Sequence, residues 1–385
     1  MAASVAVSVS ASPLSRARTE DGFALAYDLQ FDESRRVLAE AVAADPSDPA
    51  PHRAMAAIAW IEILFAQGVA TFEAFTGEVP EGDVARPPAP AHLVARFSAA
   101  LATAAHLAAR QVELDDDADA HYQVGATTAL ECVYGATVEG RTIGALRCGR
   151  RAVAAMTRAR ARSAAIPESA LLLALSEYTV ATLPWAARMV ARVSGLSGSR
   201  ARAMALLEEA AAPGALTASD ALLLRMVIYA REGRHEAVVA DVRVLQARHP
   251  GNRLFWLNEG AAAAATCRWA EADAAFSRGI AGRRWASGPR IHGEAALWLW
   301  HRGAARAAMG RHAEAYDDLT QALAAGPRDW VRGRIHHQFG ELALVAGQTG
   351  DARREFEAAV ALSIRGGDSL MTRRARDALQ SLTRH

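Results

Sequence analysis

The sequence predicts an all-α fold built as one array of stacked helical hairpins. Apolar residues recur with the 3.6-residue period of helices along most of the 385 residues, and alternating strand patterns are sparse. One pattern of small and large residues repeats in four separate segments. Pro46 and Pro327 follow two of these segments, at points where a helix has to end. Because one hairpin cannot bury its own apolar face, such segments have to stack on one another.

Each repeat begins with a glycine on its first helix, and a short turn follows about seven residues later. The second helix carries a small residue, then a large apolar residue, then another small residue. The glycines are Gly22, Gly260, Gly303 and Gly340. The residues of the second helix are, in order, Ser34, Leu38 and Ala41; Ala272, Phe276 and Gly279; Ala315, Leu319 and Ala322; and Ala352, Phe356 and Ala359. The small residues allow two helices to approach closely, and the large residue fills the gap between them.

This pattern resembles the tetratricopeptide repeat, a helical hairpin of about 34 residues. The resemblance implies a right-handed superhelical array of about six to eight hairpins, with a concave groove along the first helices. Weaker units at 118–141, around Gly125, and at 219–251 fit between the four clear ones.

Along the chain, we expect residues 1–16 to be a disordered tail, because their short apolar stretch lacks the basic start and the length of a signal peptide. A single solenoid is expected over 17–383. Its largest irregularity is a Pro-rich loop at 67–92, which is either a lid over a surface or a disordered spacer. A polar helix at 367–383 is expected to cap the open end of the array.

The segment 181–214 differs from an ordinary repeat. An apolar helix reaches the Leu-Pro dipeptide at 183–184, and a second apolar helix follows. Gly195, Gly198 and Arg200 then form a Gly-x-x-Gly-x-Arg turn that opens the next repeat. These pieces resemble a segment of the eukaryotic inclusion-body-clearance family of tetratricopeptide proteins. That resemblance implies protein contacts and association with membranes or lipid bodies.

Together with TVEGR at 137–141 and RDWVRGR at 328–334, the same segment is similar to uncharacterised bacterial tetratricopeptide proteins. The bacterial resemblance covers most of residues 20–380, and the eukaryotic one covers about a quarter of that length. Neither resemblance brings a catalytic residue.

Composition and charge exclude several classes of protein. Hydrophobic residues make up 51% and charged residues 22%, which is typical of a packed core rather than of disorder. The formal net charge is +1, so no overall field attracts nucleic acid or a membrane. Cys132, Cys148 and Cys267 fit neither a disulfide framework nor a zinc spacing. We therefore expect buried thiols in a reducing, cytoplasmic setting.

No set of residues points to catalysis. The sequence has no phosphate loop, no dinucleotide-binding fingerprint and no nucleophile elbow, so we expect no enzyme, no cofactor and no small-molecule substrate. His337 and Glu341 share one helix face but supply only two ligands, and a metal site needs at least three, so no metal is expected. The acidic run at 115–119 lacks the Gly and the terminal Glu of a calcium loop and is typical of a helix N-terminus.

The concave groove is the expected partner site. The repeat register places an aromatic residue and several polar residues on its inner side, above a floor of alanines. These groove residues are Tyr122, Gln123, Asn258, Trp300, His301, His337 and Glu341. Small floor residues with a few spaced aromatic and polar side chains suit an extended peptide or a partner helix. The alternative is that a neighbouring C-terminal segment fills the groove.

A second candidate surface is basic. Seven arginines and no acidic residue lie between Arg141 and Arg162, and five of them fall within about 120° of one helix face. This arginine stripe consists of Arg147, Arg150, Arg151, Arg158 and Arg162. It suits phosphates or an acidic partner, and the alternative is a solvated face paired with acids of the loop at 115–117. Nucleic acid is disfavoured because no aromatic residue interleaves the stripe.

Trp185, followed by Arg188 and Arg192, allows an interfacial helix with an aromatic residue and a basic edge. Pro184 and the many neighbouring alanines favour a buried inter-repeat helix instead. The sequence thus predicts a non-catalytic scaffold that binds a partner protein in its groove. The alternative function is a peripheral membrane or lipid-associated factor that uses the arginine stripe and the Trp185 helix.

Overall fold

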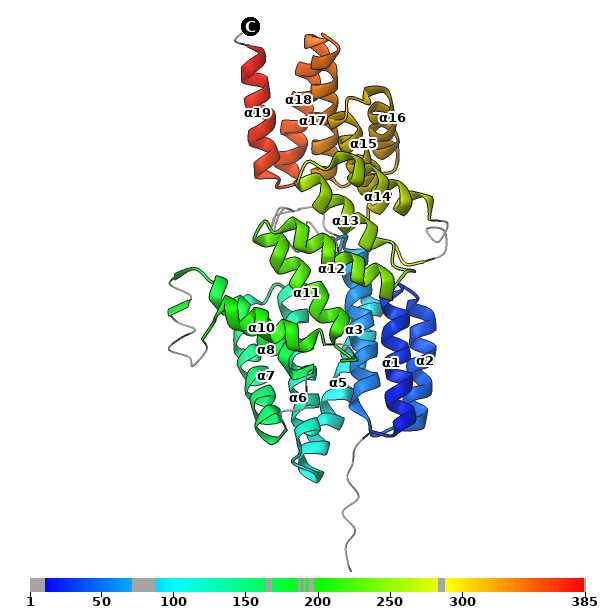
Figure 1. Cartoon of the computed structure of the whole chain (residues 1–385), viewed down its shortest axis with the longest axis vertical. Helices are drawn as coiled ribbons and strands as arrows, with labels where there is room; N and C mark the ends of the chain where they lie inside the picture. Colours follow the sequence, from blue (N-terminus) through cyan, green and yellow to red (C-terminus); the bar gives the residue numbers. More distant parts are fainter. Residues whose placement is uncertain are drawn as a thin grey trace, which may run out of the picture. The chain divides into compact units, whose positions relative to one another are not determined.

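The computed structural model describes residues 11–70, 87–163, 166, 168–185, 188–189, 192, 197–212, 214–282 and 288–383. Every regular element in these ranges is an α-helix (Figure 1), and successive helices pack as hairpins. The expected fold class, an all-α array of tetratricopeptide-like hairpins, is therefore confirmed. The chain divides into two compact units, residues 1–63 with 89–225 and residues 64–88 with 226–385. We describe each unit by itself.

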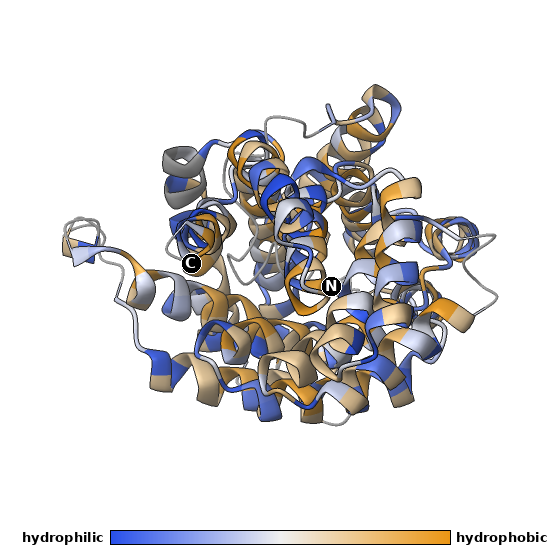
Figure 2. Cartoon of the chain, turned by 90° about the horizontal axis from the view of Figure 1, so that it is seen from above, coloured by the Kyte–Doolittle hydropathy of each residue, from blue (hydrophilic) through white to orange (hydrophobic). Residues whose placement is uncertain are grey.

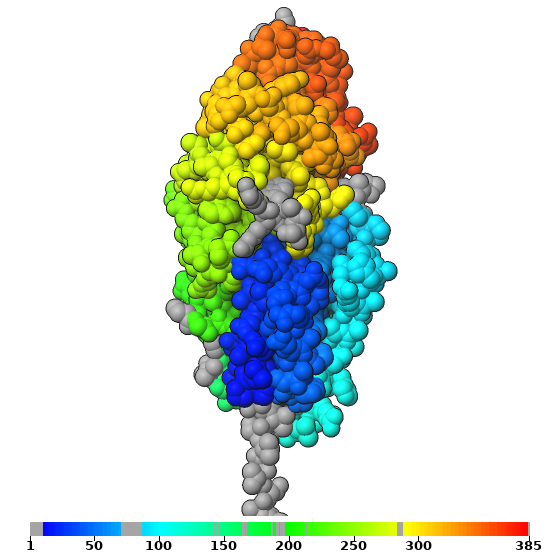
Figure 3. Space-filling view, turned by 90° about the vertical axis from the view of Figure 1, so that its right-hand side faces the viewer, coloured from blue at the N-terminus to red at the C-terminus, as the bar shows by residue number. Residues whose placement is uncertain are grey.

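The first unit begins with two helices that pack as a hairpin and lie side by side in the space-filling view (Figure 3). Two further packed pairs follow, α6 with α7 and α8 with α10. The helices are α1 (Pro13–Tyr27), α2 (Phe31–Ala44), α3 (Pro49–Ala66), α5 (Ala91–Leu114), α6 (Ala118–Thr137), α7 (Thr142–Arg162), α8 (Glu168–Thr182), α10 (Arg200–Ala210) and α11 (Ala218–Arg231). The last turns of α3 and α11 belong to the second unit.

The second unit contains three hairpins, α13 with α14, α15 with α16 and α17 with α18. Its helices are α12 (His235–Arg248), α13 (Leu254–Ala265), α14 (Trp269–Ala281), α15 (Glu294–Ala308), α16 (His312–Ala324), α17 (Asp329–Val345), α18 (Thr349–Arg365) and α19 (Ser369–Leu382). One core cluster joins these hairpins through Phe276, Trp298, Leu319 and Trp330. Most helices carry apolar and polar residues together, as packing of one face onto a neighbour requires (Figure 2).

The predicted contact between small and large residues forms in all four clear repeats. An added Cβ atom would lie 2.7 Å from Leu38 at Gly22, 2.4 Å from Phe276 at Gly260 and 3.0 Å from Leu319 at Gly303. The large residues are fully buried, and each packs against the glycine that lies sixteen positions earlier in the chain. The repeat register derived from the sequence is therefore correct.

The hairpin turns share one backbone conformation. Seven residues after the repeat glycine, the chain has a positive φ at Leu29, Cys267, Gly310 and Gly347. In each turn the next amide donates to a carbonyl five residues back, as Arg311 does to Arg306. This is the left-handed C-cap that favours glycine, so Leu29 and Cys267 adopt it at a steric cost.

The first helix starts inside the expected tail. Helix α1 begins at Pro13, because the Ser12 side chain accepts from the Ser15 amide at 3.1 Å. The backbone amide of Ser12 donates to Asp45 at 2.9 Å, and the buried Ser15 hydroxyl donates to Asp48 at 2.7 Å. Residues 12–16 are thus part of the first hairpin and not of a tail.

Most of the expected Pro-rich loop at 67–92 lies outside the described residues. At its start, the carbonyl of Phe65 accepts from the amide of His292 at 2.9 Å, and the carbonyl of Gly68 accepts from the Arg328 guanidinium. The alternatives of lid and spacer stay predictions. At the other end of the chain, α19 lies within the expected range 367–383 and packs on α18.

Candidate functional site

Trp300 and His301 of the expected groove lie side by side on α15 in the second unit. Their ring centroids are 4.2 Å apart. Trp300 is half-buried and contacts Trp330 edge to face at 6.1 Å, with the Arg334 guanidinium 5.4 Å from its ring centroid. His301 stacks on the buried ring of Phe276 at 5.1 Å. Both rings are therefore held in place by the chain itself.

His337 and Glu341 lie one turn apart on α17 of the same unit. His337 Nδ1 is 3.9 Å from Glu341 Oε1, and its ring centroid is 5.3 Å from that of Phe356. Burial lowers the pKa of the His337 imidazole, and the nearby Glu341 carboxylate partly opposes this shift. The Glu341 side chain is about half exposed, at 51%. His337 is thus mostly a packed ring, while Glu341 presents its charge to solvent.

Asn258 is more buried than a contact residue would be. It lies on α13 with 8% of its surface exposed, and its amide contacts the sulfur of Met226 at 3.8 Å. Little of its side chain is therefore left to meet a partner, and its place in the groove stays a prediction.

Tyr122 and Gln123 belong to the first unit, where they lie on α6. The Arg53 guanidinium is 5.5 Å from the Tyr122 ring centroid and donates to the Gln123 side chain. Burial raises the pKa of the Tyr122 phenol. Gln123 is only 6% exposed. The expected groove residues therefore divide into this pair and the set on α13, α15 and α17, and their joint role stays a prediction.

A partly buried polar contact that the sequence did not indicate lies in the same unit. The Tyr27 hydroxyl of α1 donates to the Asp220 carboxylate of α11, across 193 positions of sequence. Burial raises the pKa of Asp220 to about 6, although the hydrogen bond from Tyr27 acts in the opposite direction. No local motif marks such a pair, because its two members meet only through the stacking of helices.

The arginine stripe lies on α7, as predicted, and all five of its residues are exposed. Arg162 binds the loop before α6, donating from Nε to the Asp116 carbonyl at 2.7 Å and from Nη2 to its carboxylate. Arg151 pairs with Glu131 of α6 at 3.3 Å. The stripe residues without an ion pair in the described ranges are Arg147, Arg150 and Arg158. Pairing with the loop at 115–117, the sequence alternative, thus accounts for Arg162 alone, and Arg151 pairs with an acid of α6 instead.

Trp185 is exposed, and the preference for a buried inter-repeat helix is wrong at this residue. Its side chain is 72% exposed, and Met189, one helical turn later, is 43% exposed. Arg188 and Arg192 are exposed as well. Because α8 ends at Thr182, before Pro184, the chain leaves the packed pair of α8 and α10, and no described residue covers the indole. Gly195, part of the expected turn, lies outside the described residues.

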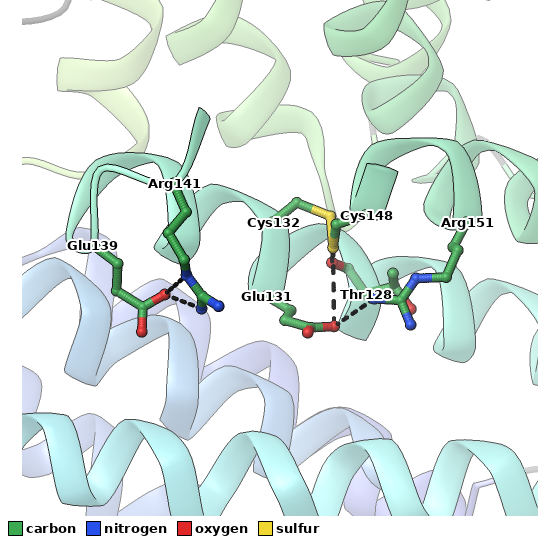
Figure 4. Close-up of a disulfide and its surroundings, with 7 residues drawn as sticks. All are labelled: Thr128, Glu131, Cys132, Glu139, Arg141, Cys148 and Arg151. Atoms are coloured by element: carbon green, nitrogen blue, oxygen red, sulfur yellow. Dashed lines mark hydrogen bonds and ion pairs between the residues drawn. A yellow bond between two sulfur atoms is a disulfide. The ribbon is translucent and has the colours of Figure 1, made fainter. Parts of the chain in front are cut away.

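Cys132 and Cys148 form a disulfide between α6 and α7, which corrects the expectation of separate buried thiols (Figure 4). Their Cα atoms are 5.5 Å apart, and 16 positions of sequence separate them. The two residues are about equally far from the turn between the helices, so they face each other across the hairpin. That symmetry is the signal that could have identified the pair. Cys267 is a free, exposed thiol in a turn.

Neither a metal centre nor a membrane span is visible in the described part of the chain. No three His, Cys, Asp or Glu side chains there gather closely enough to hold a metal ion. No helix among the described residues has the length and apolar character needed to cross a bilayer.

Comparison with known proteins gives a likeness to solved structures alone. No protein-family model matches the chain. No curated protein matches it either. A tetratricopeptide repeat protein from Parabacteroides merdae is 12% identical over 75% of this chain and 94% of its own, with a TM-score of 0.36. The human IFIT1 dimer with m7Gppp-AAAA is 13% identical over 97% and 87%, with a TM-score of 0.48. The Cut9–Hcn1 hetero-tetramer is 12% identical over 92% and 59%, with a TM-score of 0.44.

These comparisons do not confirm the resemblance of residues 181–214 to the inclusion-body-clearance family. The tetratricopeptide-like character of the chain rests on its own hairpins, which have a fixed spacing of glycine, turn and buried large residue.

Proposed function

We propose that the chain is a non-catalytic scaffold that binds a segment of a partner protein along the first helices of its hairpins. The observation that supports this best is the immobilised set of rings on α15 and α17. Trp300, His301 and His337 are partly exposed, and each is held by a ring of its own chain. Because these rings are already fixed in place, binding restricts the conformational freedom of the partner but not that of the scaffold. The entropic cost of binding is therefore lower.

The polar groups around these rings define the kind of segment that fits. Glu341 offers an exposed carboxylate one turn from His337. Arg334 lies over the Trp300 ring, but it is buried and paired with Asp368, so it holds the ring in place. An exposed carboxylate next to aromatic surface suits a peptide with one apolar side chain and flanking polar or basic groups. Catalysis is not part of the proposal, because no convergent acid, base and nucleophile set lies near these rings in the described ranges.

The test compares the partners captured by the wild-type chain with those captured by two variants. Trp300→Ala/His301→Ala alters the rings, and Ile364→Ala is the matched control, because Ile364 is 54% exposed on the second helix α18. A photo-crosslinking residue at position 300 then identifies the bound segment. We expect the ring variant alone to lose one specific protein. Equal capture by all three chains, or capture of nucleic acid, would contradict the proposal.

The exposed helical turn at Trp185 favours a second function, association with an anionic membrane surface. Trp185 and Met189 share one face, while Arg188 and Arg192 share the next, which is the arrangement of an interfacial helix. Arg147, Arg150 and Arg158 of α7, which form no ion pair with a described residue, add positive charge that anionic lipid headgroups attract.

Vesicle flotation tests this second function. We expect binding to phosphatidylserine-containing vesicles and none to pure phosphatidylcholine, with binding lost in Trp185→Ala and in Arg150→Glu/Arg151→Glu. If vesicle binding is unchanged in both variants, the membrane function is refuted and the scaffold function remains. A cytoplasmic setting, expected from the sequence, suits either function, and the Cys132–Cys148 pair would there meet a pool of small thiols.

A further inference from the structure

A surface cavity of about 220 Å³ lies against the disulfide in the first unit. Both cysteines line it, together with the side chains of Arg141, Arg147, Arg151 and Glu131. Figure 4 shows the two sulfur atoms between Arg141 and Arg151, with the Glu131 carboxylate below them in this view. Cys132 and Cys148 are largely buried, with 9% and 8% of their surfaces exposed, but both line the cavity, so a small molecule there lies against the disulfide.

The cavity is electropositive. Three guanidinium groups line it against one carboxylate, that of Glu131. Glu131 pairs with Arg151 at 3.3 Å, and Arg141 pairs with Glu139, but Arg147 makes no ion pair with any described residue. An anionic group that enters meets an unneutralised guanidinium, which is the side chain best suited to hold a carboxylate or a sulfonate.

We propose that the Cys132–Cys148 pair is a thiol–disulfide exchange site for a small anionic thiol that this cavity binds. The thiolate of the small molecule attacks the Cys132 sulfur, which lines the cavity. A new sulfur–sulfur bond forms, the Cys132–Cys148 bond breaks, and its electron pair leaves on Cys148. Water protonates that thiolate, and the thiol then has acceptors in place, the Thr128 carbonyl at 3.4 Å and Glu131 Oε2 at 3.9 Å.

A second molecule of the small thiol completes the exchange. Its thiolate attacks the sulfur of the bound small molecule, releases that molecule as its symmetric disulfide, and leaves Cys132 as a thiol. Two thiols are thereby oxidised and one protein disulfide is reduced, so electrons and protons balance. The reverse sequence uses the symmetric disulfide to oxidise the two cysteines.

The experiment measures how fast thiols of different charge reduce the protein disulfide. The chain carries Cys267→Gly, so that only the pair reacts, and circular dichroism confirms the fold of every variant. The probes are 2-mercaptoethanesulfonate, 2-mercaptoethanol and cysteamine, which carry negative, zero and positive charge. Each rate, followed by mass spectrometry after acid quenching, is divided by the rate of the same thiol with a small neutral disulfide, which removes differences in intrinsic nucleophilicity.

We expect the anionic thiol to exceed the cationic one by about tenfold at low salt and to lose that advantage in about 1 M salt. Arg147→Gln/Arg151→Gln should abolish the advantage. Arg110→Gln, which removes an exposed arginine of α5 away from the cavity, should keep it. Equal normalised rates for all three probes would overturn the proposal. The proposal would also be overturned if Cys132 and Cys148, once reduced, were not oxidised by an excess of the disulfide form of the anionic probe.

Discussion

The ring of Phe356 packs directly on the backbone of Gly340, where an added Cβ atom would lie 2.6 Å from Cε1. The two residues are sixteen positions apart, as are Gly22 and Leu38 in the first hairpin. Because the contact joins the first helix of a hairpin to its second, it sets how closely the two helices approach. The glycine is therefore a requirement of packing and not of backbone conformation.

Gly340→Ala should destabilise the chain even though alanine is the better helix former. Overpacking against a ring that is 1% exposed costs about 1–3 kcal/mol, and the gain in helix propensity returns at most ~1 kcal/mol. The control is Gly350→Ala on α18, where an added Cβ meets nothing within 4 Å. Urea denaturation followed by circular dichroism should show a lower midpoint for the first variant and an equal or higher one for the control. A rise for both would mean that Phe356 moves aside freely.

Cys267→Gly should stabilise the chain. Cys267 has φ 59° in the turn after α13, a conformation that costs a non-glycine residue about 1 kcal/mol. The reciprocal change, Gly310→Ala, introduces that strain at the equivalent turn, where no neighbour lies within 4 Å of the new atom. The two variants should shift the thermal midpoint in opposite directions. Shifts of the same sign would show that the turn conformation is not what decides stability here.

Glu294→Gln should be among the most damaging single changes. The Glu294 carboxylate is 2% exposed, and it accepts from Arg253 at 2.6 and 2.7 Å and from the Ile291 amide at 2.9 Å. Neutralising it leaves the buried Arg253 charge unmatched, which costs about 3 kcal/mol. Glu33→Gln, which breaks an exposed pair with Arg36, is the control and should leave the unfolding midpoint unchanged. Equal effects of the two changes would contradict the importance of burial.

Asp220→Asn should change how stability depends on pH. The pKa of Asp220 is raised to about 6 in the folded chain, so its contribution to stability is complete below pH 4 and is lost as pH rises through 6. The loss is about 3 kcal/mol. The asparagine variant does not suffer it, because an amide does not ionise in this range and still accepts from Tyr27. At pH 7 the variant should be the more stable chain, and at pH 4 the two should be similar. Parallel pH profiles would show that Asp220 does not titrate in this range.

The repeat register could be predicted from the sequence because it depends on the sizes of the side chains at fixed positions. Gly260, Ala272, Phe276 and Gly279 reveal by their volumes alone where two helices touch. The spacing also predicted a turn about seven residues after each glycine, and the structure has a positive φ there, at Cys267 in this hairpin. The basic face of α7 could be predicted in the same way, because the spacing of residues along a helix determines which face each side chain lies on.

The features that escaped prediction depend on what a residue meets across the fold. The disulfide required the exact pairing of α6 with α7, and the Tyr27–Asp220 contact required the stacking of helices far apart in the sequence. Trp185 was misread because its surroundings in sequence are those of a buried helix, whereas its exposure depends on where the chain goes after Pro184. The groove residues show the same limit, since Asn258 was expected to meet a partner but is nearly covered.

The disulfide also gives the chain a mechanical property. If the molecule is pulled from both ends, the residues between Cys132 and Cys148 cannot lengthen while the bond holds, even after α6 and α7 have unravelled. The 16 positions between them correspond to about 50 Å of extended chain that is withheld from the pull. Reduction of the disulfide releases this segment, so the maximum length of the stretched chain depends on the redox state of the two cysteines as well as on the force.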